Sequence, residues 1–437
     1  MMYYLLNISR VHWPLQLSFM LLLSQLSLAQ STTQLDLKTA LHRSESNNAQ
    51  LLLYPYQQQQ AVALTQQAQL RPTPELSLEV ENIVGNGDYQ TFDSAEITLS
   101  LSQNIELGGK QHKRTAYAYA SGELEQAEFT LSRLDILAET SRRYYQGLKM
   151  QALETVLTDQ IKQQQKALTL ISQRAQSAAV NQAAVAKIDL RLAQSQALFD
   201  ALKLEKRLSY RRLAAMWQDN VDFDSLAGNF KLMLNVPDEE TVLAAWQNSP
   251  VFMQQQAALR LADANVHLAQ SQGRSNINLG LGLRHFQASD SQAVNLSISV
   301  PLAFKNPNRG RIKAAQAMQR KSQLQLQQQQ NLLTLQLLDL QVQMQGLQQQ
   351  IQTIKISLLP KAHRLVQETE SGLKRGHFSV LEWLDAQTEL VALQKEQIEK
   401  THLMYLQLLE LERITGQALL APNRRSPSVD AMENKDV

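Results

Sequence analysis

Two stretches of this chain are almost alike, although they lie far apart in the sequence. Ile97–Arg114 reads ITLSLSQNIELGGKQHKR, and Val294–Arg311 reads VNLSISVPLAFKNPNRGR. Both begin with alternating apolar and small polar residues, pass through Gly, Pro or Asn, and then become basic and helical in pattern. Leu99 and Leu296 are 197 positions apart (296 − 99). The chain is therefore expected to contain the same structural unit twice.

A second alternating segment precedes each of these stretches, so each copy predicts a β-hairpin. The segments are ELSLEVENIV at 75–84 and NINLGLGLRHF at 276–286, and polar loops join them to the next strand. The arms have about the length of a tilted membrane strand, ~9–11 residues. Alternation of this kind is typical of a strand between lipid and a wet lumen. A soluble, half-buried sheet gives the same pattern, so the strands alone leave both interpretations open.

A very long helix is predicted after each hairpin. Gln111–Ser177 contains no Pro and has the helical period, and its 67 residues would form a rod of about 100 Å. The second copy, Arg311–Ser371, contains Pro360, which is expected to kink or break it. Shorter helical partners follow over Ala184–Trp217 and Ser379–Thr415.

Residues 1–29 are predicted to be an export signal. Arg10 and His12 precede an apolar run that ends in small residues at alternate positions, with cleavage expected after Ala29. A membrane anchor is the weaker interpretation, because the run is shorter than the ~20 residues of a span. We therefore expect an exported protein of the cell envelope.

Composition excludes several classes of function. Cysteine is absent, which excludes disulfides, thiolate metal sites and cysteine-based catalysis. The balance of 42 basic and 40 acidic residues gives no broad basic face for nucleic acid. The scattered His residues form no metal-binding motif, no Ser/His/Asp constellation is present, and the Gly-Gly-Lys at 108–110 lacks the spacing of a phosphate loop. We expect no enzyme activity, no cofactor and no metal site.

The predicted elements are incomplete in a single chain. Four strands cannot close a membrane barrel, since the smallest closed barrels use ~8. Long helices with one apolar stripe also need partners to cover it. Several copies of the chain could pool their hairpins into one barrel and their helices into one tube. The predicted fold class is mixed, mainly α with a small β part.

Three separated fragments resemble the TolC-type outer-membrane efflux proteins. They are PELSLEVEN at 74–82, LSQNIELGGK at 101–110 and VLEWLDAQTEL at 380–390, and the first two are closest to the CzcC-like branch, which serves cation-exporting pumps. The resemblance covers about residues 35–420. Many relatives carry a lipid-bearing cysteine at the mature N-terminus. This chain has none, so its membrane attachment would rest on the barrel alone.

The resemblance implies a homotrimer in the bacterial outer membrane. Long antiparallel helices would form a periplasmic α-barrel, and four strands per chain would contribute to a 12-stranded transmembrane β-barrel. The assembly would be a passive conduit that works with a periplasmic adaptor (membrane fusion) protein and an inner-membrane RND-type pump. Heavy-metal cations would be the cargo. The irregular stretches 218–249 and 414–437 would supply a belt and a loose tail.

We divide the chain into four parts on this basis. Residues 1–29 are the signal peptide, 30–226 the first repeat, 227–420 the second repeat, and 421–437 a disordered tail. Each repeat is expected to run helix, hairpin, long helix, shorter helix.

Five residues are predicted to let the chain turn from sheet to helix, because Gly, Pro and Asn favour turns. They are Gly108, Gly109, Pro301, Asn306 and Gly310.

The predicted periplasmic tip in the second repeat is the turn SGLKRGHFSVLEWLDAQ, at 371–387. Gly372 and Gly376 are expected to break one helix, and Ser379 to begin the next. The resemblance places acidic aperture residues at Glu382 and Asp385, and threefold rings of carboxylates would favour cations.

A simpler role is open for one of these carboxylates. Ser379 and Glu382 fit the S-x-x-E capping box, in which the Glu only satisfies backbone N–H groups. Asp385 lies deeper in the helix and is the better aperture candidate. Asp189, its counterpart in the first repeat, has Lys187 and Arg191 nearby and is expected to be paired or solvated.

Three other functions remain open from the sequence. The same fold could conduct drugs and organic solutes, or secreted polypeptide in type I secretion. An exported trimeric coiled-coil tether or adhesin without a pore would not need the hairpins. A periplasmic enzyme would need a catalytic constellation that the sequence does not show.

Overall fold

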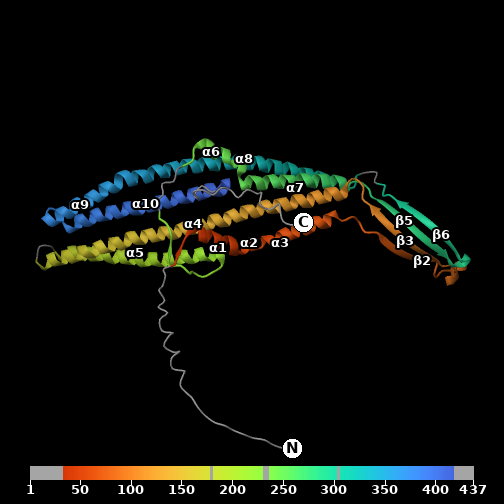
Figure 1. Ribbon diagram of the computed structural model, residues 1–437, viewed down its shortest axis with the longest axis horizontal. Coiled ribbons are helices and arrows are strands. Elements are labelled where there is room, and N and C mark those ends of the chain that lie inside the picture. Colours follow the sequence, from red (N-terminus) through yellow and green to blue (C-terminus); the bar gives the residue numbers. More distant parts are fainter. Residues whose placement is uncertain (1–32, 178–180, 230–235, 303–305, 418–437) are drawn as a thin grey trace, which may run out of the picture.

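The computed structural model describes residues 33–177, 181–229, 236–302 and 306–417. The helices run along the long axis of an extended molecule, and a β-sheet projects from one end (Figure 1). The mixed, mainly α fold class is therefore confirmed. The expected signal peptide (1–29) and C-terminal tail (421–437) lie outside the described residues.

The two predicted hairpins form one antiparallel sheet. Its strands are β2 (Glu75–Glu81), β3 (Glu96–Ile105), β5 (Ile277–Phe286) and β6 (Ser291–Ser299), in the order β2-β3-β5-β6. β3 and β5 join the two hairpins, although about 180 residues separate them in the sequence. The register places four leucines in one row across the sheet: Leu76, Leu101, Leu281 and Leu296.

The first long helix is continuous, as predicted. α4 (Lys110–Gln176) has 67 residues, and its only interior glycines, Gly122 and Gly147, do not interrupt it. The predicted bounds of this helix, 111–177, each differ from the observed bounds by one residue.

Pro360 was expected to kink or break the second long helix, and the structure shows a local irregularity there but no break. α8 (Arg309–Thr353) passes through a π-helical turn (Ile354–Leu358) into α9 (Leu359–Arg375), with Pro360 at the second position of α9. Proline lacks an N–H and its ring clashes with the carbonyl four residues before it. The wider π turn is the type of local adjustment that accommodates such a residue. The rod therefore continues beyond this turn and bows along its length (Figure 1).

The remaining helices include the two predicted shorter partners. The α-helices are α1 (Leu37–Asn47), α2 (Ala49–Leu52), α3 (Tyr54–Gln69), α5 (Gln182–Ala214), α6 (Glu239–Ala244), α7 (Pro250–Gln272) and α10 (Val380–Thr415). Short 3₁₀ turns lie at Gly87–Tyr89, Phe92–Ser94, Ala215–Trp217, Ala245–Asn248 and Gln287–Ser289. No helix in the described ranges is both long enough and apolar enough to cross a membrane.

The helices lie side by side in two successive arrays. Near the sheet their order is α3, α4, α7 and α8, which continues the strand order β2, β3, β5 and β6. Towards the far end the order is α5, α4, α10 and α9. Each strand of the sheet thus connects to the helix that extends its line, and α4 lies inside both arrays.

A small parallel sheet braces the middle of the molecule, where the sequence predicted only an irregular stretch. β1 (Gln34–Leu35) pairs with β4 (Ser225–Leu226). The buried hydroxyl of Tyr144 on α4 donates to the carbonyl oxygen of Ala227 at 2.5 Å and lies 3.0 Å from that of Leu35. Burial raises the pKa of this phenol, so it remains a neutral donor.

Gly147 is required where β4 meets α4. A Cβ at this position would lie 2.5 Å from Cδ1 of the buried Leu226 and 3.3 Å from Cε1 of Tyr210. Gly346 on α8 is the opposite case, because a Cβ there would meet nothing within 4 Å.

We expect Gly147→Ala to destabilise the protein, because overpacking costs roughly 1–3 kcal/mol and outweighs the gain in helix propensity. Gly346→Ala is the matched control and should stabilise by about 0.5–1 kcal/mol. Thermal unfolding followed by circular dichroism in detergent measures both. Equal stabilisation by the two substitutions would contradict the close contact at Gly147.

Candidate functional site

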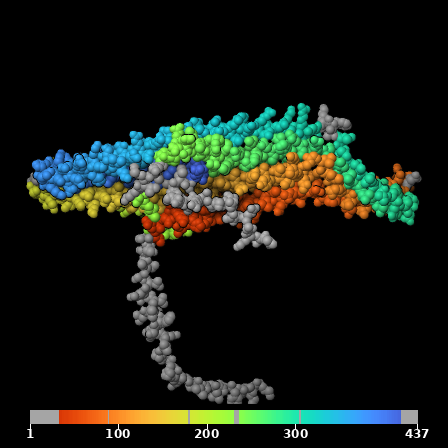
Figure 2. All heavy atoms as spheres, turned by 45° about the horizontal axis from the view of Figure 1, so that its top comes forward, coloured from red at the N-terminus to blue at the C-terminus, as the bar shows by residue number. Residues whose placement is uncertain are grey.

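The projecting sheet has one apolar face that the described part of the chain does not cover. Leu296 is 72% exposed, Leu281 59% and Leu76 68%. The sheet extends beyond the ends of the helices (Figures 1 and 2). The aliphatic residues of this face are Leu76, Leu78, Val80, Ile97, Leu99, Leu101, Leu279, Leu281, Leu283, Val294, Leu296 and Ile298. A soluble half-buried sheet would cover such a face with a core, and the described residues supply none.

The opposite face of the sheet is polar and acidic. Ser77 and Ser100 hydrogen-bond across the strands at 2.7 Å. Arg284 forms ion pairs with Glu96 at 2.8 Å and Glu81 at 3.2 Å. The charged side chains on this face are Glu75, Glu79, Glu81, Glu96 and Arg284. Four carboxylates against one guanidinium leave a net negative surface. Sequence reasoning identified the polar face but not this ion-pair cluster, whose members lie on three strands.

The two outer strands of the sheet have unpaired edges. Within the described residues, no strand pairs with the outer edge of β2 or of β6. Exposed strand edges pair readily with other strands. The outer helices of each array also expose large apolar side chains. Among these are Met318, Leu324, Leu332, Leu335 and Val342 on α8, and Leu190, Leu198, Leu204 and Leu208 on α5.

Two adjacent glycines turn the chain from β3 into α4. Gly108 has φ +77° and Gly109 φ +67°, in the left-handed region that glycine adopts without strain. A Cβ on Gly108 would also lie 2.7 Å from Cγ of Arg274. Gly108 therefore permits both the turn and the close approach of the neighbouring segment.

The second sheet-to-helix turn uses different chemistry. The carbonyl oxygen of Pro301 accepts a hydrogen bond from Oγ of Ser275 at 2.7 Å. Oδ1 of Asn306 accepts one from the backbone N–H of Asn308 at 2.9 Å. Gly310 lies in the first turn of α8, after the change of direction, and not at the turn itself. Residues 303–305 are not described.

Side-chain hydrogen bonds join the four places where the chain passes between sheet and helices. Nε2 of Gln103 donates to the carbonyl oxygen of Pro72 at 2.9 Å. Nζ of Lys110 contacts Oδ1 of Asn276. Nδ2 of Asn308 donates to the carbonyl oxygen of Ala269 at 2.5 Å. These contacts hold the four passages between sheet and helices, here called crossings, side by side. None of the contacts was predicted, because each joins segments that are distant in sequence.

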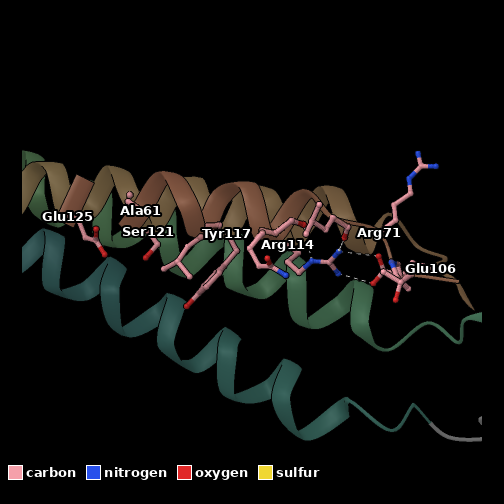
Figure 3. A pocket seen from close by; sticks show the side chains of 15 residues that line it. Ala61, Arg71, Glu106, Arg114, Tyr117, Ser121 and Glu125 are labelled. Carbon is pink, nitrogen blue, oxygen red and sulfur yellow. Dashed lines mark hydrogen bonds and ion pairs between the residues drawn. The ribbon is translucent and has the colours of Figure 1, made fainter. Parts of the chain in front are cut away.

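A groove of about 720 Å³ lies between α3 and α4 beside this junction (Figure 3). Arg114 closes one end, where its guanidinium pairs with Glu106 at 2.8 Å and donates to the carbonyl oxygens of Ala68 and Leu70. Arg71 points away from the groove in this view. The Arg114 donors are therefore used to fasten the end of α3 to α4.

The second-repeat tip begins α10 with a complete capping box. Oγ of Ser379 accepts from the N–H of Glu382 at 3.2 Å, and the Glu382 carboxylate accepts from the N–H of Ser379 at 2.7 Å. These hydrogen bonds, from the Ser379 backbone first, lower the pKa of Glu382 from 4.5. The contribution of the cap to stability is complete above 4.5 and is lost as the pH falls through the lower folded value.

The helix before this turn ends later than predicted. Gly372 is buried inside α9 and does not break it. A Cβ at Gly372 would meet the Phe378 ring at 2.2 Å, so the glycine makes room for that ring to fold back on the helix. Gly376, with φ +80°, ends the helix, and its N–H bonds to the carbonyl oxygens of Gly372 and Leu373.

Asp385 joins the two repeats at the tip. Its Oδ1 lies 2.9 Å from Nη1 of Arg191 on α5, while 63% of the Asp385 side chain remains exposed. Nη2 of Arg174 donates to the carbonyl oxygen of Leu373 at 3.2 Å, which adds a second link. Asp189 was expected to be either paired, with Lys187 or Arg191 nearby, or solvated. Asp189 is exposed and forms no ion pair within the described part of the chain.

Next to these polar contacts, α4 and α5 share an apolar cluster with α9 and α10. Its buried members are Ala167, Ile171, Ile188, Leu373, Val380, Trp383 and Leu384. Trp383 is 5% exposed and packs between helices within this cluster. Among the described residues, no group of three or more His, Cys, Asp or Glu side chains could hold a metal ion.

Comparison with known proteins is consistent with this architecture. The model of the family described as outer membrane efflux protein matches residues 242–417. A search of curated proteins by sequence gives no match.

Solved structures share the fold over most of the chain. CusC, described in terms of transmembrane channel formation, superposes with a TM-score of 0.73 and 17% identity over 87% of this chain and 92% of its own. The outer membrane protein VceC of Vibrio cholerae gives 0.71 and 15% over 88% and 96%. The MtrE outer membrane channel of Neisseria gonorrhoeae gives 0.70 and 14% over 88% and 89%. Residues 242–417 thus match the outer membrane efflux protein family, and the described chain shares the fold of these three solved structures.

Proposed function

We propose that this chain is one subunit of a homotrimeric outer-membrane efflux channel, with most of its length in the periplasm. The sheet supports this proposal most directly. It has one exposed aliphatic face, one polar face and two unpaired edges. Three copies that paired β6 of one with β2 of the next would supply twelve strands, enough to close a membrane barrel.

The helices support the same assembly. Their order continues the strand order, so a closed ring of strands implies a ring of helices that prolongs the channel. The exposed apolar side chains of α8 and α5 lie on outer helices of the two arrays, where a neighbouring copy would cover them. A coiled-coil tether would leave the two-faced sheet without a role.

The subunit would be a passive conduit and not an enzyme. Energy and substrate choice would come from an inner-membrane RND-type pump, linked through a periplasmic adaptor protein. This part of the proposal rests on two similarities. Residues 242–417 match the outer membrane efflux protein family, and the sequence resembles TolC-type proteins.

We propose heavy-metal cations as the cargo class, in line with the CzcC-like fragments. The acidic polar face of the sheet supports cations as a class, because four carboxylates against one guanidinium per subunit would make a negative lumen. Rings of Asp385 at the tip would act in the same direction. The Arg191 partner neutralises part of that charge and would tie the aperture residue to α5.

Leu281→Arg should prevent channel formation, because a cation on the lipid face costs roughly 2–4 kcal/mol at the membrane midplane. Asn295→Arg, on the polar face of the adjacent strand, is the matched control and should insert normally. The measurement is trimer yield in outer-membrane fractions, followed by single-channel conductance in planar bilayers. A wild-type protein without conductance, or equal loss in both variants, would overturn the proposed function.

Asp385→Asn should reduce the preference of the open channel for cations over anions, measured as the reversal potential across a salt gradient. Arg191→Gln, which frees the carboxylate, should leave that preference equal or higher. Glu382→Gln is the neighbouring control, since its carboxylate is engaged in the cap, and it should change stability more than selectivity. Unchanged selectivity in Asp385→Asn would remove this residue from the aperture.

A further inference from the structure

Basic side chains gather where the sheet meets the helices. We call eight of them the basic collar: Arg71, Lys110, Lys113, Arg114, Arg274, Arg309, Arg311 and Lys313. They lie in four segments, 69–74, 103–114, 270–276 and 306–314, which contain one acidic residue, Glu106. Glu106 is paired with Arg114. The collar is therefore strongly positive in a chain whose total charge is balanced.

The four segments come together in space. The hydrogen bonds of Gln103, Lys110 and Ser275 join neighbouring crossings, and Arg274 contacts Gly108. Five members of the collar are exposed and form no ion pair with the described residues. They are Arg71, Arg274, Arg309, Arg311 and Lys313. Their charges are available for a partner outside the chain.

The collar lies directly beside the end of the apolar face. Ile105 and Ile277 are the last residues of that end of β3 and β5, and the collar residues Lys110 and Arg274 lie within five positions of them. Leu302, between β6 and α8, is 78% exposed. Aliphatic side chains thus give way abruptly to exposed cations, in the order in which a bilayer changes from hydrocarbon to phosphate.

The opposite end of the sheet has the reverse charge. Glu81 and Glu96 lie at the ends of β2 and β3 nearest the loops, Asp93 and Asp290 lie in the loops, and Arg284 is engaged by the two glutamates. Apart from the engaged Arg284, the basic side chains of the sheet and its junction therefore lie at the helix end, where Glu75 begins β2 on the polar face. A random distribution of surface charge would not give this asymmetry, which suits an anionic layer on one side only.

We propose that the basic collar binds the phosphate groups of anionic phospholipids, such as phosphatidylglycerol, in the leaflet that surrounds the helix end of the sheet. Long Lys and Arg side chains reach a headgroup layer while their stems lie along apolar surface. Such contacts would fix the depth of the sheet in the membrane. The inference rests on the proposed function, since it needs the sheet to be inserted in a bilayer.

The test is lipid selection by the assembled protein. Wild-type protein is reconstituted into vesicles of equal phosphatidylglycerol and phosphatidylcholine, extracted into polymer-bounded discs, and its lipids are quantified by mass spectrometry against protein-free discs. We expect phosphatidylglycerol to be enriched about threefold around the protein, given the attraction of clustered Lys and Arg to anionic lipid. High salt should reduce the enrichment, because it screens exposed charges.

A combined collar variant, Arg274→Gln, Arg309→Gln, Arg311→Gln and Lys313→Gln, should return the lipid ratio to that of protein-free discs. These side chains have no described ion-pair partner, so the fold should persist. The matched control replaces four exposed basic residues of the helical arrays far from the sheet: Lys162→Gln, Lys166→Gln, Lys203→Gln and Arg207→Gln. It should keep the wild-type enrichment.

Three outcomes would overturn the inference. If the wild-type channel conducts but phosphatidylglycerol is not enriched around it, lipid binding by the collar is refuted and the proposed function stays intact. A collar variant that keeps its lipids but shifts ion selectivity would assign these charges to the lumen. Failure of the wild-type protein to insert or conduct would overturn the proposed function and this inference with it.

Discussion

Everything else in this structure depends on a four-stranded sheet that is stable only with partners for its edges and its apolar face. Each outer strand presents a row of backbone N–H and C=O groups. Twelve aliphatic side chains lie on one face, and no core formed by the described residues covers them. The proposed ring of such sheets in a membrane would pair the free edges with other strands and place the apolar face against hydrocarbon.

The pairing of the two hairpins explains how a single polypeptide forms one continuous array of strands and helices. Because β3 pairs with β5, the two hairpins lie side by side, and α4 and α7 follow in the same order. The Gly108-Gly109 turn and the hydrogen bonds at the junction fix the direction in which helices leave the sheet. At the far end, Asp385–Arg191 and the shared apolar cluster join the repeats again. The two repeats are thus connected at both ends of the rod.

Local signals in the sequence predicted much of this arrangement. Period-2 alternation located the hairpins, and the Ser379–Glu382 pattern marked the start of α10, because a capping box is complete within four residues. At Pro360 the predicted irregularity is present as a π turn, but the alternative of a break misled the prediction, since a proline alone does not reveal how the helix adjusts to it. Gly372 misled it for another reason: its role is to make room for Phe378, which depends on a fold-back seen only in space. Arg191–Asp385 and β1–β4 join residues nearly two hundred positions apart, so no local pattern indicated them.

The central claim is that β2 of one copy pairs with β6 of another, and cysteine cross-linking tests it directly. The chain has no cysteine of its own. Within one copy β3 and β5 separate the two edges by roughly 14 Å, beyond the ~7 Å that a disulfide spans. Ser77→Cys is combined in turn with Ala293→Cys, Asn295→Cys or Ser297→Cys, and the outer-membrane fraction is oxidised. The account predicts, for at least one pair, a ladder of linked species that stops at three chains. Only uncross-linked monomer with all three pairs would contradict it.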